Sequence, residues 1–198
     1  MNRLATAIDR PAPAVRSRPL GRVAGAFARS AVYCALLIPV GTAALLAVLA
    51  GRAGVAVSWW RRLRTGLLRV APAPAGRPGP AAVLRHAVAS ILLGAVALVP
   101  LGVQVLMLLR GVLYGLVDRG PYDHSWGGPG RAGAWLAHFL VGVPMSLAGL
   151  AALVGIAALH QRLTGSLDGA RSSRWLAPVT VVVGLAGALF VVAWSRQL

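Results

Sequence analysis

The chain has no lysine and no glutamate, and its only acidic residues are four aspartates. Only 12% of its 198 residues are charged, whereas 58% are hydrophobic. A water-soluble domain usually carries about 25% charged residues. The single cysteine, Cys34, argues against an intramolecular disulfide and against a cysteine metal cluster. These deficits disfavour a soluble enzyme, a disulfide scaffold and a zinc finger, and they indicate an integral membrane protein.

All twenty basic residues are arginine, and the net charge of +16 is at first sight typical of a nucleic-acid-binding protein. Such a protein needs its basic residues on one folded face. Here the arginines instead lie between apolar runs. We therefore expect the lipid bilayer, and not nucleic acid, as the partner of the chain.

Three stretches are long and apolar enough to cross a bilayer, which takes about 20 residues per helix. They are residues 87–109, 132–159 and 175–194. Residues 30–60 are also apolar, but Arg52 interrupts them. The sequence thus predicts an all-α fold, a polytopic transmembrane helical bundle with three strong spans and a short or re-entrant hairpin.

The distribution of arginine predicts the topology, because cytoplasmic loops are enriched in basic residues. If residues 30–60 cross once, the arginines divide ten to ten; if they enter and return, the division is 16 inside to 4 outside. We therefore expect a multi-pass protein of the cell membrane, the inner or plasma membrane, with a cytoplasmic N-terminus. Residues 30–60 reach only ~46 Å as a helix, less than the ~60 Å of two full crossings. We expect the hairpin to turn near Pro39-Val40-Gly41 or slightly later, with Arg52 at the cytoplasmic surface or paired within the bundle.

Residues 114–138 differ from the surrounding Ala-, Leu- and Val-rich sequence. They hold two aspartates, two histidines, two tyrosines and two tryptophans beside the turn-forming run GPYDHSWGGP at 120–129. On the predicted topology this 110–133 loop lies outside the cell. The candidate ligand or signal residues are Tyr122, Asp123, His124, Trp126, Gly127, Gly128, Pro129, Trp135 and His138.

Each of these residue types has an alternative role. Histidine and carboxylate side chains are metal ligands, but the spacing of Asp118, Asp123, His124 and His138 is not that of a metal site, so we expect none. Asp123 and His124 instead cap the loop or pair with Arg119 and Arg131. His138 is either a proton-sensitive group or, as we favour, a neutral hydrogen-bonded histidine beside Trp135. Trp126 and Gly127 to Pro129 form either an aromatic ligand pocket or an interfacial anchor and turn.

Two further features have a simple membrane explanation. Gln104, inside an apolar stretch, is expected to form an interhelical hydrogen bond. Arg61, Arg62, Arg64 and Arg69, next to two tryptophans, predict a basic segment at the membrane surface, against anionic lipid, with docking of a cytoplasmic partner as the alternative. No Ser-His-Asp set, nucleotide loop or paired intramembrane carboxylates is present, so we expect neither an enzyme nor a cofactor.

Beyond these residue patterns, the chain resembles a known family. GPYDHSW-GGP followed by AGAWLAH, and then GIAALHQRLTG at 155–165, resembles the sensor domain of actinobacterial membrane proteins. The stretch at 30–68 is similar to the first half of that domain. The family usually precedes a histidine kinase, so the resemblance implies a four-helix transmembrane sensor module. After residue 168 this chain has an additional apolar stretch where a kinase would begin, so we expect a stand-alone version.

The expected organisation is a disordered cationic cytoplasmic tail at 1–29, a sensor transmembrane domain at 30–168 and a C-terminal transmembrane helix at 169–198. The expected function is non-catalytic signal perception through the 110–133 loop. The expected partner is a separate histidine kinase or another membrane protein, and a homo-oligomer is a further option. The alternative function is an accessory or structural subunit of a membrane transporter or envelope complex.

Overall fold

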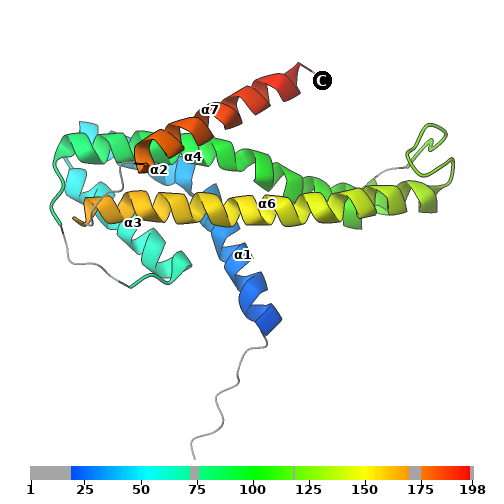
Figure 1. The fold of residues 1–198 in the computed structure, drawn as a ribbon, viewed down its shortest axis with the longest axis horizontal. Helices are drawn as coiled ribbons and strands as arrows, with labels where there is room; N and C mark the ends of the chain where they lie inside the picture. Colours follow the sequence, from blue (N-terminus) through cyan, green and yellow to red (C-terminus); the bar gives the residue numbers. More distant parts are fainter. Residues whose placement is uncertain (1–18, 72–75, 118, 170–174, 197–198) are drawn as a thin grey trace, which may run out of the picture.

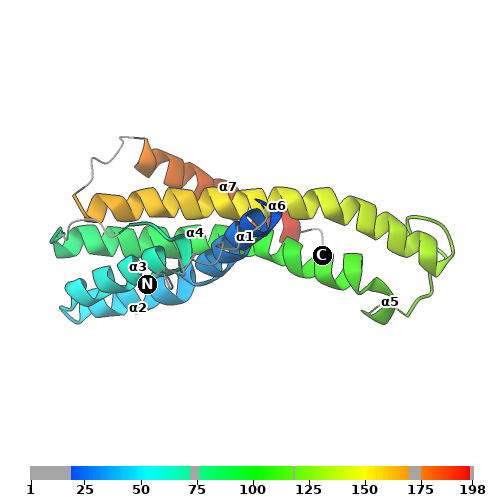
Figure 2. The same cartoon turned by 90° about the horizontal axis from the view of Figure 1, so that it is seen from below.

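The computed structural model describes residues 19–71, 76–117, 119–169 and 175–196, and these form helices without any strand. The elements in chain order are α1 (Pro19–Ala35), α2 (Leu37–Leu49), α3 (Ala53–Leu68), α4 (Pro80–Leu106), η1 (Met107–Val112), α5 (Tyr114–Val117), α6 (Arg131–Leu167) and α7 (Leu176–Ser195). α4 and α6 run antiparallel along the long axis of the molecule (Figure 1). α2 and α3 pack at one end of this pair, and the loop between α5 and α6 forms the other end (Figure 2).

Two helical segments are long and apolar enough to cross a membrane, Pro80–Val112 and Arg131–Leu167. A third span results if α1 and α2, which meet at a bend of 41°, are counted as one broken helix. The third predicted strong span, 175–194, forms the helix α7, in which the residues described in full give only the shorter apolar segment Pro178–Gly187. The all-α class is confirmed, and the number of spans supported in the described residues is two to three.

The predicted turn near Pro39-Val40-Gly41 is wrong, because these residues lie inside α2. A proline has no N–H to donate to the carbonyl of the residue four positions earlier, and here that residue is Ala35, where α1 ends. Pro39 therefore breaks the helix into α1 and α2 without reversing the chain. The reversal comes later, at Ala50 to Arg52, where Gly51 has a φ of 74° and Arg52 is exposed.

Two other boundaries also differ from the prediction. Residues 19–29 belong to α1 and are not disordered, whereas residues 1–18 lie outside the described part of the chain. The helix over the predicted span 132–159 does not end at Leu159, because α6 continues for two more turns to Leu167. His160 and Thr164 are buried against neighbouring helices, so polar side chains here stabilise the helix packing and do not mark a loop.

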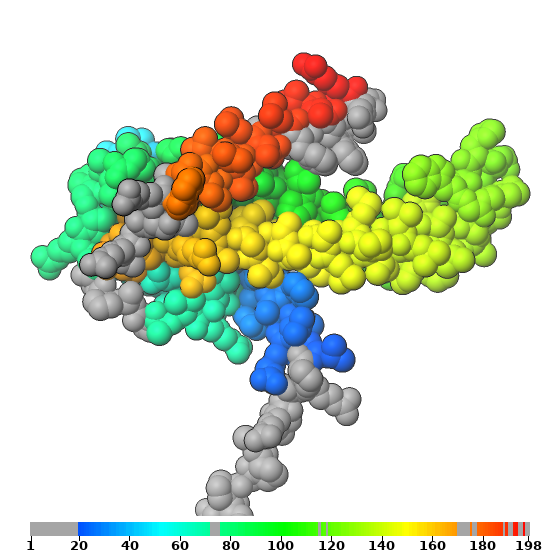
Figure 3. Space-filling model, in the orientation of Figure 1, coloured from blue at the N-terminus to red at the C-terminus, as the bar shows by residue number. Residues whose placement is uncertain are grey.

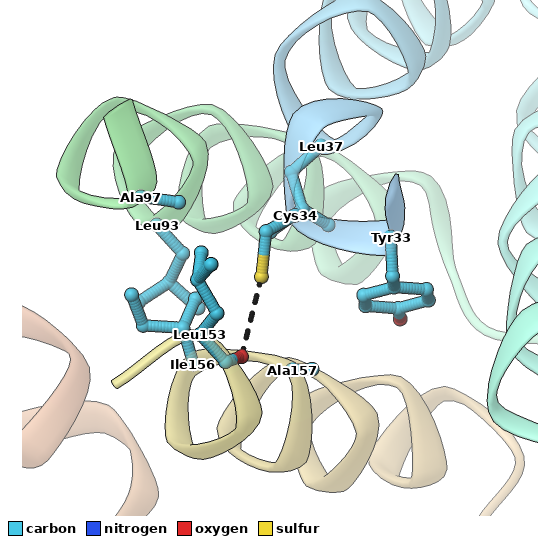
Figure 4. Packing of buried hydrophobic residues seen from close by; sticks show 8 residues of the cluster. All are labelled: Tyr33, Cys34, Leu37, Leu93, Ala97, Leu153, Ile156 and Ala157. Atoms are coloured by element: carbon cyan, nitrogen blue, oxygen red, sulfur yellow. Dashed lines mark hydrogen bonds between the residues drawn. The ribbon is translucent and has the colours of Figure 1, made fainter. Parts of the chain in front are cut away.

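The core lies where α1, α4 and α6 meet. Leu37, Leu93 and Leu153 are fully buried there, beside Cys34, whose Sγ donates a hydrogen bond to the carbonyl of Leu153 at 3.4 Å (Figure 4). Farther along the same helix pair, Ser146 Oγ donates to Gln104 Oε1 at 2.6 Å. The predicted interhelical contact of Gln104 is therefore confirmed, and it joins α4 to α6.

The two ends of the bundle differ in charge. The α2–α3 turn, the start of α4 and the end of α6 lie together at one end and carry exposed Arg52, Arg77, Arg85 and Arg162 (Figure 1). The opposite end carries Arg110, Arg119 and Arg131. The charge-free lengths of α4 and α6 between these ends are compatible with a membrane protein.

Candidate functional site

A pocket lies between η1, the loop at 119–130 and the first turns of α6, and we call it the loop pocket. Its volume is about 730 Å³, within the range of about 300–1,000 Å³ that is usual for ligand sites. The loop projects from the end of the α4–α6 pair, far from α1 and α3 (Figure 3). The residues that line it include Val103, Leu106, Met107, Arg110, Tyr114, Asp123, His124, Ser125, Trp126, His138, Val141 and Met145.

A widened helix prepares one wall of the loop pocket. At Met107–Val112 the regular helix gives way to a π-helical segment, which leaves carbonyl groups free for other donors. The indole Nε1 of Trp135 donates to the carbonyl of Gly111 at 2.7 Å. This bond fixes the end of η1 against the first turn of α6.

Aromatic rings close the inner side of the loop pocket. The ring of His138 is stacked on that of Tyr114, with centroids 4.7 Å apart and planes at 27°. His138 Nδ1 lies 2.8 Å from the carbonyl of Ala134, so this nitrogen carries a proton and donates it. Tyr122 lies beside Tyr114, with ring centroids 6.1 Å apart. This geometry fits the favoured reading of His138 as a hydrogen-bonded interfacial histidine.

The polar rim of the loop pocket is largely unpaired within the described part of the chain. Arg110, Asp123 and His124 are exposed, and their side chains form no hydrogen bond or ion pair with another described residue. The Ser125 hydroxyl is buried and also has no described partner. The expected pairing of Asp123 and His124 with Arg119 or Arg131 is therefore absent from the described residues. Unpaired groups of both charge signs, next to a buried hydroxyl, can receive a polar ligand.

The structure brings only some of the predicted loop residues together. Asp123, His124, Trp126 and His138 line the loop pocket, whereas Trp135 lines a separate hollow of about 450 Å³ between η1, α5 and the start of α6. Gly127 is packed against Gly133, where a Cβ atom would overlap the backbone. Neither Tyr122 nor Gly127 lines the loop pocket, and neither do the exposed Gly128 and Pro129. Their role is to shape the turn.

The described residues contain no group of three or more histidine, cysteine or acidic side chains that could hold a metal ion. Asp118, considered above as one donor, lies outside the described residues. The donor pair that remains in the loop, Asp123 and His124, consists of adjacent residues. Adjacent side chains do not easily converge on one ion, so the loop pocket is better suited to an organic ligand.

The four arginines of the predicted basic membrane-surface segment lie in two different environments. Arg62 and Arg69 are exposed, but Arg64 is buried and its Nη2 bonds Asp168 Oδ2 at 2.7 Å. Arg61 bonds the other carboxylate oxygen of Asp168, also at 2.7 Å. Asp168 ends α6, so it draws these two α3 side chains inward. Two of the four arginines thus join α3 to α6 and do not face lipid.

A second polar site, which the sequence analysis missed, lies in the core near this ion pair. We call Tyr33, His86, Ser90, His160 and Thr164 the histidine cluster; all five are buried. Tyr33 Oη is 2.7 Å from His160 Nδ1, and Ser90 Oγ is 2.8 Å from His160 Nε2. The cluster joins α1, α4 and α6, and Trp60 of α3 contacts the His86 ring edge-on at 4.4 Å. The sequence signal was spacing: Ser90 follows His86, and Thr164 follows His160, by one helical turn.

Comparison with known proteins gives no further assignment. No protein-family model, curated protein or solved structure matches this chain. The site therefore has to be interpreted from its own residues.

Proposed function

We propose that the chain is a stand-alone membrane sensor that binds an amphiphilic ligand in the loop pocket and signals to a separate membrane or cytoplasmic partner. The observation that carries the proposal is the composition of the loop pocket. Unpaired polar groups of both charge signs stand at its rim, and an apolar wall continues below them along α4, η1 and α6. The resemblance to actinobacterial sensor domains favours the same role.

The charge asymmetry of the bundle supports an orientation with the loop pocket outside the cell. Four exposed arginines lie at the opposite end of the bundle, around the α2–α3 turn and the end of α6, whereas the loop end has three together with the exposed Asp123. Basic residues favour the cytoplasmic side. In this orientation the loop pocket opens at the outer surface of the cell membrane, and the paired Asp168 lies on the inner side.

The lining indicates the chemical class of the ligand. Leu106, Met107 and Met145 belong to segments apolar enough to lie at the depth of the lipid chains. A hydrocarbon chain fits this wall, because apolar surface is removed from water there. At the rim, Arg110 would bind a phosphate, and Asp123 would accept a hydrogen bond from a headgroup hydroxyl. We therefore propose a lipid-like molecule with a hydroxyl-bearing phosphate headgroup.

One continuous helix connects the loop pocket to the inner end of the bundle. α6 runs without a break from Arg131 to Leu167, and ~45 Å separate His138 from Asp168 at the rise of an α-helix. A displacement of the outer end of α6 by a ligand would therefore act on the ion pairs of Asp168 with Arg61 and Arg64. Their rearrangement is the change that a partner would detect.

A titration with a short-chain lipid tests the proposal. The chain in nanodiscs is titrated with dihexanoyl phosphatidylglycerol, and Trp126 fluorescence is followed as the difference between wild type and Trp126→Phe. We expect saturable binding that weakens about tenfold in Arg110→Gln, the usual effect of losing one charge-assisted hydrogen bond. Glycerol phosphate, which lacks the chains, should bind far more weakly. Pro129→Ala, outside the loop pocket, is the matched control.

The outcomes separate the proposal from its alternative. No saturable signal with the lipid, or equal binding by the Arg110→Gln variant, overturns the ligand assignment. If the chain also purifies with a transporter and stabilises it, the accessory-subunit function replaces the sensor. Orientation is tested with Pro129→Cys in a Cys34→Ala background: labelling only from the cytoplasm would contradict an outer loop pocket.

A further inference from the structure

The hydroxyl groups of the histidine cluster determine where its protons lie. Ser90 Oγ donates to the carbonyl of His86 at 2.7 Å, and Thr164 Oγ1 donates to the carbonyl of His160 at 2.9 Å. A hydroxyl has one proton to donate and lone pairs to accept with. Both hydroxyls are therefore acceptors toward the imidazole rings that they also contact.

The imidazole protons follow from this arrangement. His160 donates from Nε2 to Ser90 Oγ at 2.8 Å, and its Nδ1 accepts the phenol proton of Tyr33 at 2.7 Å. His86 donates from Nε2 to Thr164 Oγ1 at 3.3 Å. With both rings neutral, every proton that lies on a polar atom of the cluster has an acceptor. A buried polar network of this kind is stabilising only when it is fully satisfied.

A further proton added to the histidine cluster has no position from which it can donate to a free acceptor. On His160 it must go to Nδ1, where it faces Tyr33 Oη and removes the acceptor of the phenol proton. Thr164 Oγ1 is 3.5 Å from the same nitrogen, too far for a strong bond. On His86 the added proton would go to Nδ1, which has no hydrogen-bond partner among the described residues. On His160 the added proton therefore makes a fully buried group an unsatisfied donor, and on His86 it has no acceptor among the described residues.

The surrounding charges do not compensate for this proton. The ring centroids of His86 and His160 are only 4.9 Å apart, so a charge on one ring disfavours a charge on the other. From α1 the titratable neighbours are Tyr33 and Cys34, and from α6 the only carboxylate among the described residues is Asp168. Asp168 already binds two α3 side chains, Arg61 and Arg64. No free carboxylate in the described core is available to the imidazoles.

We propose that the histidine cluster is a proton-binding site that holds α1 on α6 while both imidazoles are neutral and releases α1 when a proton binds. The released state accepts the proton more readily, because its imidazoles meet water. Acidification therefore shifts the population toward release, as linkage requires. This inference is independent of the loop pocket, because none of the five residues lies there.

Cys34 provides a reporter for the release of α1, since it is the only cysteine and its Sγ bonds Leu153 of α6. The chain in nanodiscs is treated with a dipyridyl disulfide, which reacts with thiols in acid, from about pH 8 to about pH 4, a range that includes histidine titration. Each rate is divided by that of the denatured chain at the same pH. We expect a normalised rate about 5-fold to 100-fold higher in acid, corresponding to one lost or unsatisfied hydrogen bond.

Substitutions distinguish the cluster from other titrating groups. The double variant His86→Gln and His160→Gln should lose the pH response, whereas His138→Gln, in the loop pocket, should keep it. Tyr33→Phe keeps the ring and removes the bond to His160, so it should raise labelling about fivefold already near pH 8. A pH response that persists in the double variant, or no acid response in wild type, overturns the proposal.

A measurement on the unsubstituted chain tests the proposal even if a substituted chain fails to fold. Nitrogen-15 spectra of the labelled histidines report tautomer and charge directly. We expect two neutral Nε2–H histidines near pH 8, His86 and His160, assigned by their mutual contact. They should become charged over the same pH interval in which Cys34 reacts. An Nδ1–H tautomer at His160, or protonation without a change in Cys34 reactivity, contradicts the mechanism.

Discussion

The two polar regions of α6 are opposite in kind. The loop pocket at its N-terminal end has exposed, unpaired side chains around an open volume. The histidine cluster near its C-terminal end is buried, and each of its hydroxyls makes a hydrogen bond. An open set of polar groups is available to bind something else, whereas a closed set stabilises one arrangement of helices. Polarity within an apolar helix therefore has two uses, and only contacts distinguish them.

The largest effect is expected at the ion pairs next to the histidine cluster. Asp168→Asn removes the carboxylate shared by Arg61 and Arg64, and Arg64 is only 3% exposed. An unpaired buried charge costs about 3–5 kcal/mol. Thermal or denaturant unfolding in nanodiscs measures the loss. The exposed Arg62→Gln is the control and should change stability by less than about 0.5 kcal/mol.

A medium effect is expected inside the histidine cluster. Ser90→Ala removes the acceptor of His160 Nε2 without adding volume. The unsatisfied donor should lower the free energy of unfolding by about 1–3 kcal/mol. The same unfolding assay measures it. A neutral result would show that the ring has another acceptor and that the cluster is not closed.

These expectations depend on contacts that the sequence indicates only in part. The length of the uncharged runs was enough to predict α4 and α6, because a long apolar run has few alternatives to a helix. It was not enough to predict where the chain reverses. The prediction placed the turn near Pro39, but Gly51 and Arg52 make it. A proline near the start of a helix bends the chain without reversing it, and one sequence alone does not distinguish these outcomes.

The candidate sites, too, could be predicted only in part from the sequence. The concentration of unusual residue types at 114–138 pointed to the loop pocket, and Asp123, His124, Trp126 and His138 do line it. His86 and His160 lie within two residues of Arg85 and Arg162, at the borders of the predicted spans. Their burial depends on α1 and α3, which approach from far along the chain, so the one-turn spacing to Ser90 and Thr164 did not by itself reveal it.

A smaller effect on ligand binding is expected from two glycine substitutions that change only the backbone of the loop. Gly127 and Gly128 both have positive φ, but only Gly127 is packed against the backbone of Gly133. Gly127→Ala should displace the loop and weaken binding of the lipid probe about tenfold, whereas Gly128→Ala, with open space around it, should weaken it less. Equal effects of the two substitutions would mean that the close contact is not needed.

The smallest effect on stability is expected at Ser125. Its hydroxyl has no partner among the described residues, so Ser125→Ala removes no hydrogen bond and should change unfolding by less than about 0.5 kcal/mol. Comparison with Ser90→Ala in one unfolding assay contrasts the two regions directly. A large loss at Ser125 would show that the loop pocket is already satisfied.

On a membrane-spanning placement, the length of α6 has a consequence for the bilayer. Its 37 residues extend ~55 Å, whereas the hydrocarbon layer is ~30 Å thick. The excess is taken up by tilt or by helix ends that stand outside the hydrocarbon, and packing against α4 determines the tilt. In that placement, a change in bilayer thickness changes how far the loop stands from the headgroups.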